Sequence, residues 1–420
     1  MRFLVVLACL VLAALARPST HDYLHGAQVL RVNPQTADQV HYLQGLLKTD
    51  LYDFWTEPHG TGHPVDIMAQ AFSVPVLKKT LEQIDLDFTI QVSDVALLLA
   101  KDREANQKAR AASGKAMDWT SYHRYDEIMA WLDELASTHP SLCSVKEVGT
   151  TYEGRTMKML TLNKGGTDKP GIFIDGGIHA REWISPATVT YMLNELVTNS
   201  DTYDDILSAV NFYVMPSINP DGYEYCHTDD RLWRKTRSDN GSPFGCKGAD
   251  PNRNWGHHWN ENGASDNPCS DIYAGPEAFS EIEMKNVRNQ ILDQTNLVVY
   301  LTFHSYSQLW LYPWGYTSAL PEDWQDLDDL AQSAVNALTA VHGTIYDIGS
   351  STNVLYAAAG GSDDWAKGEG NVKYSYTVEL RDTGNYGFVL PPDQIIPTGE
   401  ETFEALKVVA NFVKDNYRTP

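Results

Sequence analysis

From residue 122 onward, short apolar runs typical of strands alternate with longer stretches that have helical spacing. The apolar runs cover residues 171–175, 211–217, 297–304 and 373–380. The helical stretches cover residues 125–137, 186–196, 281–295, 326–341 and 397–413. Strands that alternate with helices argue for an α/β domain with a largely parallel sheet. We therefore predict a mixed, mainly parallel sheet with flanking helices.

The region before this domain has a different pattern. Strand-like residues 27–32, 51–55, 64–68 and 88–92 are interleaved with helical residues 36–47 and 74–83. The order β-α-β-β-α-β fits a small antiparallel sheet with helices on one face. A helical run over 95–112 follows and carries Lys108-Ala109-Arg110 close to the polar stretch 111–116. This tripeptide is either a cleavage site for a trypsin-like protease or an ordinary solvated helix end.

The N-terminus predicts export. Arg2 precedes an apolar run over 3–16 that ends Ala14-Leu15-Ala16. This arrangement is typical of a signal peptide, and the run is too short for a membrane anchor. We therefore expect residues 1–16 to be removed and the protein to be secreted.

Cysteines and charge fit an exported protein. Removal of the signal peptide would remove Cys9 and leave Cys143, Cys226, Cys246 and Cys269. An even number of cysteines in an exported protein suggests two disulfides, but the spacing alone does not choose the pairing. Asn240-Gly241-Ser242 is a possible glycan site. The formal charge of −23 argues against binding to nucleic acid or anionic membranes. It either attracts cationic substrates or simply keeps the protein soluble.

Metal-ligating residue types follow two of the predicted strands. His179 and Glu182 come directly after the strand at 171–175, and residues three apart on a helical turn point the same way. His304 ends the strand at 297–304, which places it at the same sheet edge, where ligands bind in open α/β sheets. Two His and one Glu with an open fourth position form the zinc set of hydrolases. A solvated His-x-x-Glu is the alternative; His257 and His258 could also bind metal, but we interpret them as loop residues.

Glu379 lies near the end of the strand at 373–380, which alternates with period two. A carboxylate at this place is either a general base beside the reacting water or the partner of Arg381 or Lys373.

Several longer motifs give the chain a family resemblance. His179-Ala180-Arg181-Glu182-Trp183, the run 231–237, Asp250-Pro251-Asn252-Arg253-Asn254-Trp255 and the run 360–365 resemble the pancreatic-type metallocarboxypeptidases, A and B. The resemblance spans nearly the whole chain, including the pro-region. It implies a carboxypeptidase fold with an eight-stranded sheet, one zinc ion per chain, and peptide or protein C-termini as substrates.

The resemblance also implies roles for individual residues. His179, Glu182 and His304 correspond to the zinc ligands, and Asp250 to the acceptor that orients His179. Glu379 corresponds to the base that activates water, and Arg237 corresponds to the cation that stabilises the oxyanion. The alternative for Arg231, Arg234 and Arg237 is a solvated basic stretch without a catalytic role. Three residues correspond to those that hold the substrate's terminal carboxylate, namely Asn252, Arg253 and Tyr356. Arg181 corresponds to an auxiliary contact on the substrate path. An Arg fork suits bidentate binding of a carboxylate.

Asp363 predicts the specificity. By the resemblance it lies at the floor of the side-chain pocket, where A-type enzymes carry an apolar residue and B-type enzymes carry Asp. A desolvated carboxylate needs a cation, which a C-terminal Lys or Arg would supply. The alternatives are that Asp363 pairs with Lys367, that the enzyme is A-type, or that the chain is a catalytically silent peptide-binding homologue.

The same resemblance sets the expected boundaries. We expect a signal at 1–16, an activation pro-domain at 17–110 that caps the site until a trypsin-like protease cuts after Arg110, and a catalytic domain at 111–420. Cys246 and Cys269 match a family disulfide, and we expect Cys143 to pair with Cys226. The expected oligomeric state is a monomer.

Overall fold

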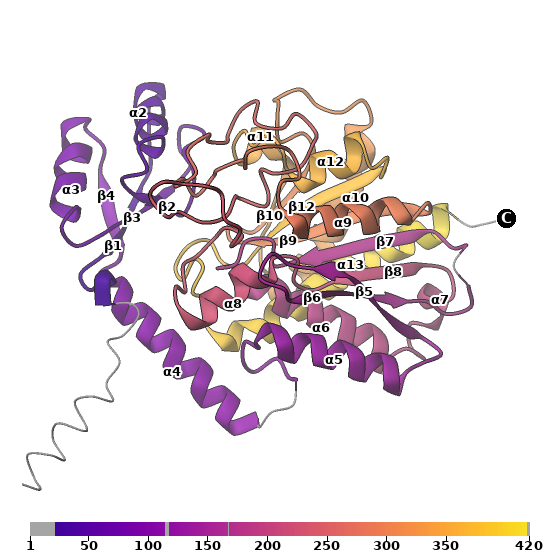
Figure 1. Ribbon diagram of the computed structural model, residues 1–420. Helices are drawn as coiled ribbons and strands as arrows, with labels where there is room; N and C mark the ends of the chain where they lie inside the picture. Colours follow the sequence, from indigo (N-terminus) through magenta and orange to yellow (C-terminus); the bar gives the residue numbers. More distant parts are fainter. Residues whose placement is uncertain (1–21, 114–116, 167, 418–420) are drawn as a thin grey trace, which may run out of the picture.

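The computed structural model describes residues 22–113, 117–166 and 168–417 (Figure 1). The predicted signal segment, the middle of the link after Arg110 and Arg418–Pro420 lie outside the described residues. Two sheets organise the described part of the chain, one of four strands and one of eight.

The small N-terminal sheet is antiparallel, as predicted. Its strands are β1 (Gln28–Val32), β2 (Asp53–Phe54), β3 (Val65–Ala69) and β4 (Phe88–Val92), in the order β2-β3-β1-β4. Its two helices are α2 (Ala37–Leu47) and α3 (Val74–Gln83). The longer helix α4 (Val95–Ser113) then leads away from this sheet toward the second domain (Figure 1).

The large sheet is mixed and mainly parallel. Its strands are β5 (Cys143–Thr150), β6 (Thr156–Leu162), β7 (Gly171–Gly176), β8 (Asn211–Met215), β9 (Leu297–Ser305), β10 (Leu309–Tyr312), β11 (Asp347–Ser350) and β12 (Tyr374–Leu380). The order is β11-β10-β12-β9-β7-β8-β6-β5. The central strands β12, β9, β7 and β8 are parallel, so their carboxyl ends share one edge.

Helices cover both faces of the large sheet. The helices are α5 (Tyr125–Thr138), α6 (Ile184–Thr198), α7 (Asp204–Leu207), α8 (Pro220–Thr228), α9 (Ile282–Asp293), α10 (Trp324–His342), α11 (Ser351–Val354), α12 (Ser362–Gly368) and α13 (Ile395–Asn416). One hydrophobic core joins α5, α6, α10 and α13 to residues such as Ile172 and Val214. A second core joins α9 and α12 to Phe173 and Tyr213, which point to the opposite face. Because successive side chains alternate, each central strand contributes to both cores.

The sequence did not predict the hairpin β5–β6 or the short strands β10 and β11. In β5 only Cys143 and Val148 are fully buried, because this strand is at the sheet edge. Such a strand carries no apolar run that a pattern search would detect.

The disulfide prediction is half right. Cys246 and Cys269 are bonded, as expected. The expected Cys143–Cys226 bond is wrong, because both thiols are free and buried. Cys143 begins β5, whereas Cys226 lies on α8 and donates to the carbonyl oxygen of Trp233 (3.1 Å).

Among the helices that the structure describes, none has the length and apolar character needed to cross a bilayer.

Candidate metal centre and substrate cavity

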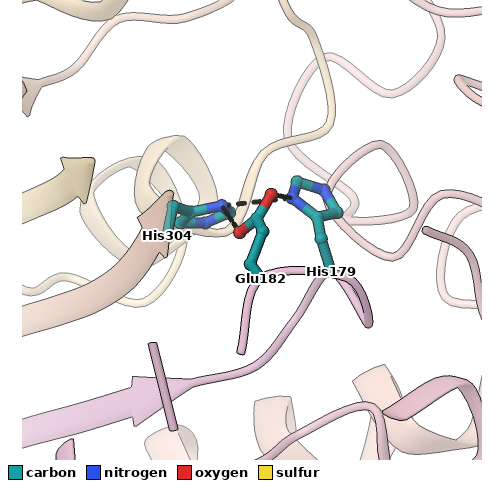
Figure 2. Close-up of side chains that lie close together, drawn as sticks. All are labelled: His179, Glu182 and His304. Atoms are coloured by element: carbon teal, nitrogen blue, oxygen red, sulfur yellow. Dashed lines mark hydrogen bonds and ion pairs between the residues drawn. The ribbon is translucent and has the colours of Figure 1, made fainter. Parts of the chain in front are cut away.

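Three predicted ligands meet at the carboxyl edge of the large sheet. His179 and Glu182 lie in the turn between β7 and α6, not on a helix, and His304 is near the end of β9. Gly177 starts this turn with φ +64°, a conformation that favours glycine. Glu182 Oε1 lies 2.8 Å from His179 Nδ1, and Glu182 Oε2 lies 3.3 Å from His304 Nδ1 (Figure 2). The two Nδ1 atoms are 3.2 Å apart, so all three side chains face one point.

The chemistry of these donors fits a zinc ion. Asp250 Oδ1 lies 3.1 Å from His179 Nε2. Because a carboxylate only accepts hydrogen bonds, Nε2 carries the proton, and the Nδ1 lone pair points to the centre. Two imidazole nitrogens and one carboxylate form a set that zinc prefers.

Buried charges fix the state of these groups. Although burial alone would raise it, the pKa of Asp250 lies well below its usual range because Arg234 and His179 favour the anion. Arg234 Nη2 lies 2.8 Å from Asp250 Oδ2. Burial and the charge of Arg234 lower the pKa of His179, which favours the neutral imidazole that binds metal.

Glu379 lies beside the ligands. It is on β12, directly opposite His304 in the parallel register. Burial and the charges of Glu182 and Asp363 raise the pKa of Glu379 to about 8, although His304 and Arg234 act in the other direction. The alternative ion pairs are wrong, since Arg381 pairs with Glu401 and Lys373 with Asp326.

The residues predicted to bind the terminal carboxylate and the terminal side chain share a cavity with the two histidine ligands. This cavity has a volume of about 40 Å³. Its lining includes His179, Asn252, Arg253, His304, Tyr356, Asp363 and Glu379. Asp363 is buried and accepts from the Ser351 hydroxyl (3.3 Å). The alternative pairing with Lys367 is wrong, because Lys367 binds Asp323 (2.9 Å).

Two carboxylates of the N-terminal domain reach this region. Glu57 Oε1 lies 3.1 Å from Arg253 Nη2, and Asp53 Oδ1 lies 3.1 Å from Arg181 Nη1. The sequence predicted neither contact, because an acidic residue in a short strand or in a loop carries no signal for a partner more than 100 positions away. Glu57 thus binds Arg253, one of the residues that the sequence predicts to bind a substrate carboxylate.

Arg237, the residue expected to stabilise the oxyanion, is not among the residues that line the cavity of Glu379. Its guanidinium stacks on Tyr225 (3.7 Å) and Trp233 (4.5 Å), and its nearest carboxylate is Glu153 (3.9 Å). Arg234, three positions earlier, instead lines a second cavity of about 360 Å³ together with Arg181 and Tyr356. Its charge acts on Glu379. Residues 231, 234, 235 and 237 are all basic, so the sequence pattern does not distinguish Arg234 from Arg237.

His257 and His258 do not join the metal group. His258 Nδ1 binds Glu261 (2.8 Å) and its ring stacks on Tyr316, whereas His257 faces Glu369 (3.5 Å). This agrees with their interpretation as loop residues.

An eight-stranded α/β sheet with two imidazoles, a carboxylate and a buried glutamate at its carboxyl edge defines a zinc-dependent hydrolase, the class that carboxypeptidase A exemplifies. The chain belongs to the zinc carboxypeptidase family, whose model matches residues 128–405. A second model, carboxypeptidase activation peptide, matches residues 30–102. The protein is therefore a zinc-dependent metallocarboxypeptidase made as a zymogen.

Known proteins of both specificity names resemble the chain. It is 77% identical over 302 residues to a carboxypeptidase B of Astacus astacus, covering 72% of this chain and all of that protein. It is 40% identical over 399 residues to carboxypeptidase A2 of Rattus norvegicus, covering 93% and 94% of the two chains. The solved carboxypeptidase A from Helicoverpa armigera superposes with a TM-score of 0.89 at 29% identity, covering 94% of this chain and all of that one.

Proposed function

We propose that the activated enzyme releases C-terminal Lys and Arg from peptides. One observation carries this proposal: Asp363 is buried on the wall of the cavity that also holds His179 and Glu379, and no Lys or Arg of the described chain forms an ion pair with it. Burial raises the pKa of Asp363, so a cation that enters the cavity stabilises the anion. The 77% identity to a protein named carboxypeptidase B supports the same specificity.

The terminal carboxylate sets the position of cleavage. Arg253, with Asn252 and Tyr356, would hold that carboxylate at one end of the cavity. Glu379 would take a proton from the attacking water and pass it to the leaving amine. Arg234, in place of Arg237, would stabilise the developing oxyanion. Zinc, held by His179, Glu182 and His304, supplies Lewis-acid chemistry when bound.

The N-terminal domain would act as a lid over this site. In this proposal residues 17–110 form the pro-domain, which places Glu57 on Arg253 and Asp53 on Arg181. Both cations would then be unavailable to substrate until a trypsin-like protease cuts after Arg110 and frees residues 111–420. The signal at 1–16, secretion and the monomeric state remain predictions of the same scheme.

Substrates that differ only in the last residue test the specificity. After tryptic activation, we expect kcat/KM for a peptide ending in Arg to exceed that for the same peptide ending in Phe by at least about 100-fold, because Phe leaves Asp363 unpaired. Asp363→Ala should remove most of this preference. A preference of the parent enzyme for Phe would instead establish the A-type alternative.

A further inference from the structure

A second buried carboxylate lies beneath the metal centre. Asp175, the fifth residue of β7, is completely buried. Its oxygens accept hydrogen bonds from the hydroxyl groups of Tyr300 (2.6 Å) and Thr302 (2.7 Å) on β9. Within the described part of the chain, no ion pair joins Asp175 to a Lys, Arg or His.

The strand register places Asp175 one row below the site. Asp175 is opposite Thr302, and Thr302 is opposite Thr377 on β12. The next row toward the carboxyl edge holds His304 and Glu379. Because residues two apart on a strand face the same side and neighbouring strands lie about 4.8 Å apart, the Cα atoms of Asp175 and His304 are roughly 8 Å apart.

An anion at this position needs compensation. Two neutral hydroxyl groups satisfy its hydrogen bonds but supply no charge, and a buried charge without a counter-ion is strongly disfavoured. Burial raises the pKa of Asp175 to about 6, while the bonds from Tyr300 and Thr302 and the charge of His304 favour the anion. The nearest place for a divalent cation is the ligand set one row above.

We propose that Asp175 is a positioning residue of the metal centre. Its carboxylate holds Thr302, and thereby the end of β9 that carries His304, and its negative charge balances the ion bound by His179, Glu182 and His304. Asp175 touches neither ion nor substrate; it acts through His304. This inference rests on the ligand set of the proposed function.

Zinc affinity tests the inference directly. The full-length precursor is prepared as the parent, Asp175→Asn and Asp221→Asn, and each is titrated with zinc against a chromogenic chelator. Asp221 is a matched control because it is also completely buried but is paired with Arg155 (2.8 Å). Since groups behind a metal ligand typically contribute 10–100-fold to affinity, we expect the zinc Kd of Asp175→Asn to rise about tenfold or more. Asp221→Asn should lower Tm and leave the zinc Kd within twofold.

Two further measurements distinguish an effect of Asp175 on the metal ligands from a general effect on the packing of the core. The absorption bands of the cobalt-substituted precursor should shift in Asp175→Asn and stay unchanged in Asp221→Asn. After tryptic activation, kcat of Asp175→Asn should fall while KM stays within about twofold, because the contacts to the substrate carboxylate are intact. An unchanged zinc Kd together with unchanged cobalt bands would overturn the inference, whatever happens to Tm.

Milder variants cover the case in which Asp175→Asn does not fold. Thr302→Val and Tyr300→Phe each delete one hydroxyl donor to Asp175 and keep the carboxylate. Thr302→Val should weaken zinc binding more than Tyr300→Phe, since Thr302 is two residues from His304; equal and parental affinities in both would overturn the inference. If the parent itself binds no zinc, the ligand set fails, which is a different result from parental affinity in the variants.

Discussion

The two sheets of the molecule differ in what covers their faces. Every residue of β12, which carries Glu379, is buried, whereas β4 of the N-terminal sheet contains no fully buried residue. The large sheet is covered by helices on both faces (Figure 1). Its reactive groups lie at the carboxyl ends of its central strands. The small sheet has its own core on one side and rests on the catalytic domain with the other.

The contacts between the domains combine ion pairs with apolar packing. Glu57 binds Arg253, Asp53 binds Arg181, and Asp102 binds Arg231 (3.3 Å). An apolar cluster that includes Trp55 and Phe388 also joins the two domains. The comparison teaches that the metal site depends on close packing, while the proposed lid also depends on Arg253 and Arg181, the cations that we propose bind the substrate.

The largest effect is expected inside the large sheet. Glu379→Gln removes the proposed base but keeps its volume, so kcat/KM of the activated enzyme should fall about 10³-fold. Hydrolysis of a peptide ending in Arg measures this. Zinc content should stay at the parental level, because Glu379 is not a proposed ligand. Activity within tenfold of the parent would assign the base to another residue.

A smaller effect is expected at the lid. Glu57→Gln in the precursor replaces a charge-assisted bond to Arg253 by a neutral one, a loss of roughly 1.4 kcal/mol, or tenfold in pro-domain affinity. We expect the lag between cleavage after Arg110 and the appearance of activity to be shorter than in the parent. Gels follow the cleavage over time, and hydrolysis of the peptide follows the activity. Glu82→Gln, an exposed glutamate on α3, is the control and should show the parental lag. An unchanged lag for Glu57→Gln would mean that the remaining ion pairs and the apolar cluster hold the lid without Glu57.

The sequence predicted the permanent site better than the lid. His179, Glu182, His304 and Glu379 follow or end apolar strands, and the parallel pairing of those strands brings their ends together. The partners Glu57 and Arg253 are 196 positions apart in loops, where no periodicity specifies a contact. The sequence does not separate the roles of Arg234 and Arg237, because they share one basic run, and only the fold shows that Arg234 turns toward Asp250.

The smallest effect is expected at the proposed cleavage site, where lid and enzyme are still joined. Arg110 donates to both oxygens of Glu127 on α5 and to the carbonyl oxygen of Tyr122 (3.1 Å). Burial alone would raise the pKa of Glu127, but the bonds from Arg110 and the Arg124 amide lower it to about 2. A carboxyl group whose pKa is lowered on folding stabilises the folded state at pH values above its ordinary pKa. This stabilisation is lost only as the pH falls toward 2, so the pair is intact at neutral pH.

A trypsin-like protease must bind the Arg110 side chain in its own acidic pocket, so the pair with Glu127 has to open first. Since about a third of each side chain is exposed, the pair is partly screened, and we expect Glu127→Gln to raise the rate of tryptic cleavage about threefold. Glu134→Gln, an exposed residue of the same helix, should be cut at the parental rate. Once cleaved, parent and Glu127→Gln should have the same kcat/KM, because α5 does not line the cavity. A parental cleavage rate for Glu127→Gln would show that the protease reaches Arg110 without opening this pair, and that the lid is regulated only by the contacts near Glu57.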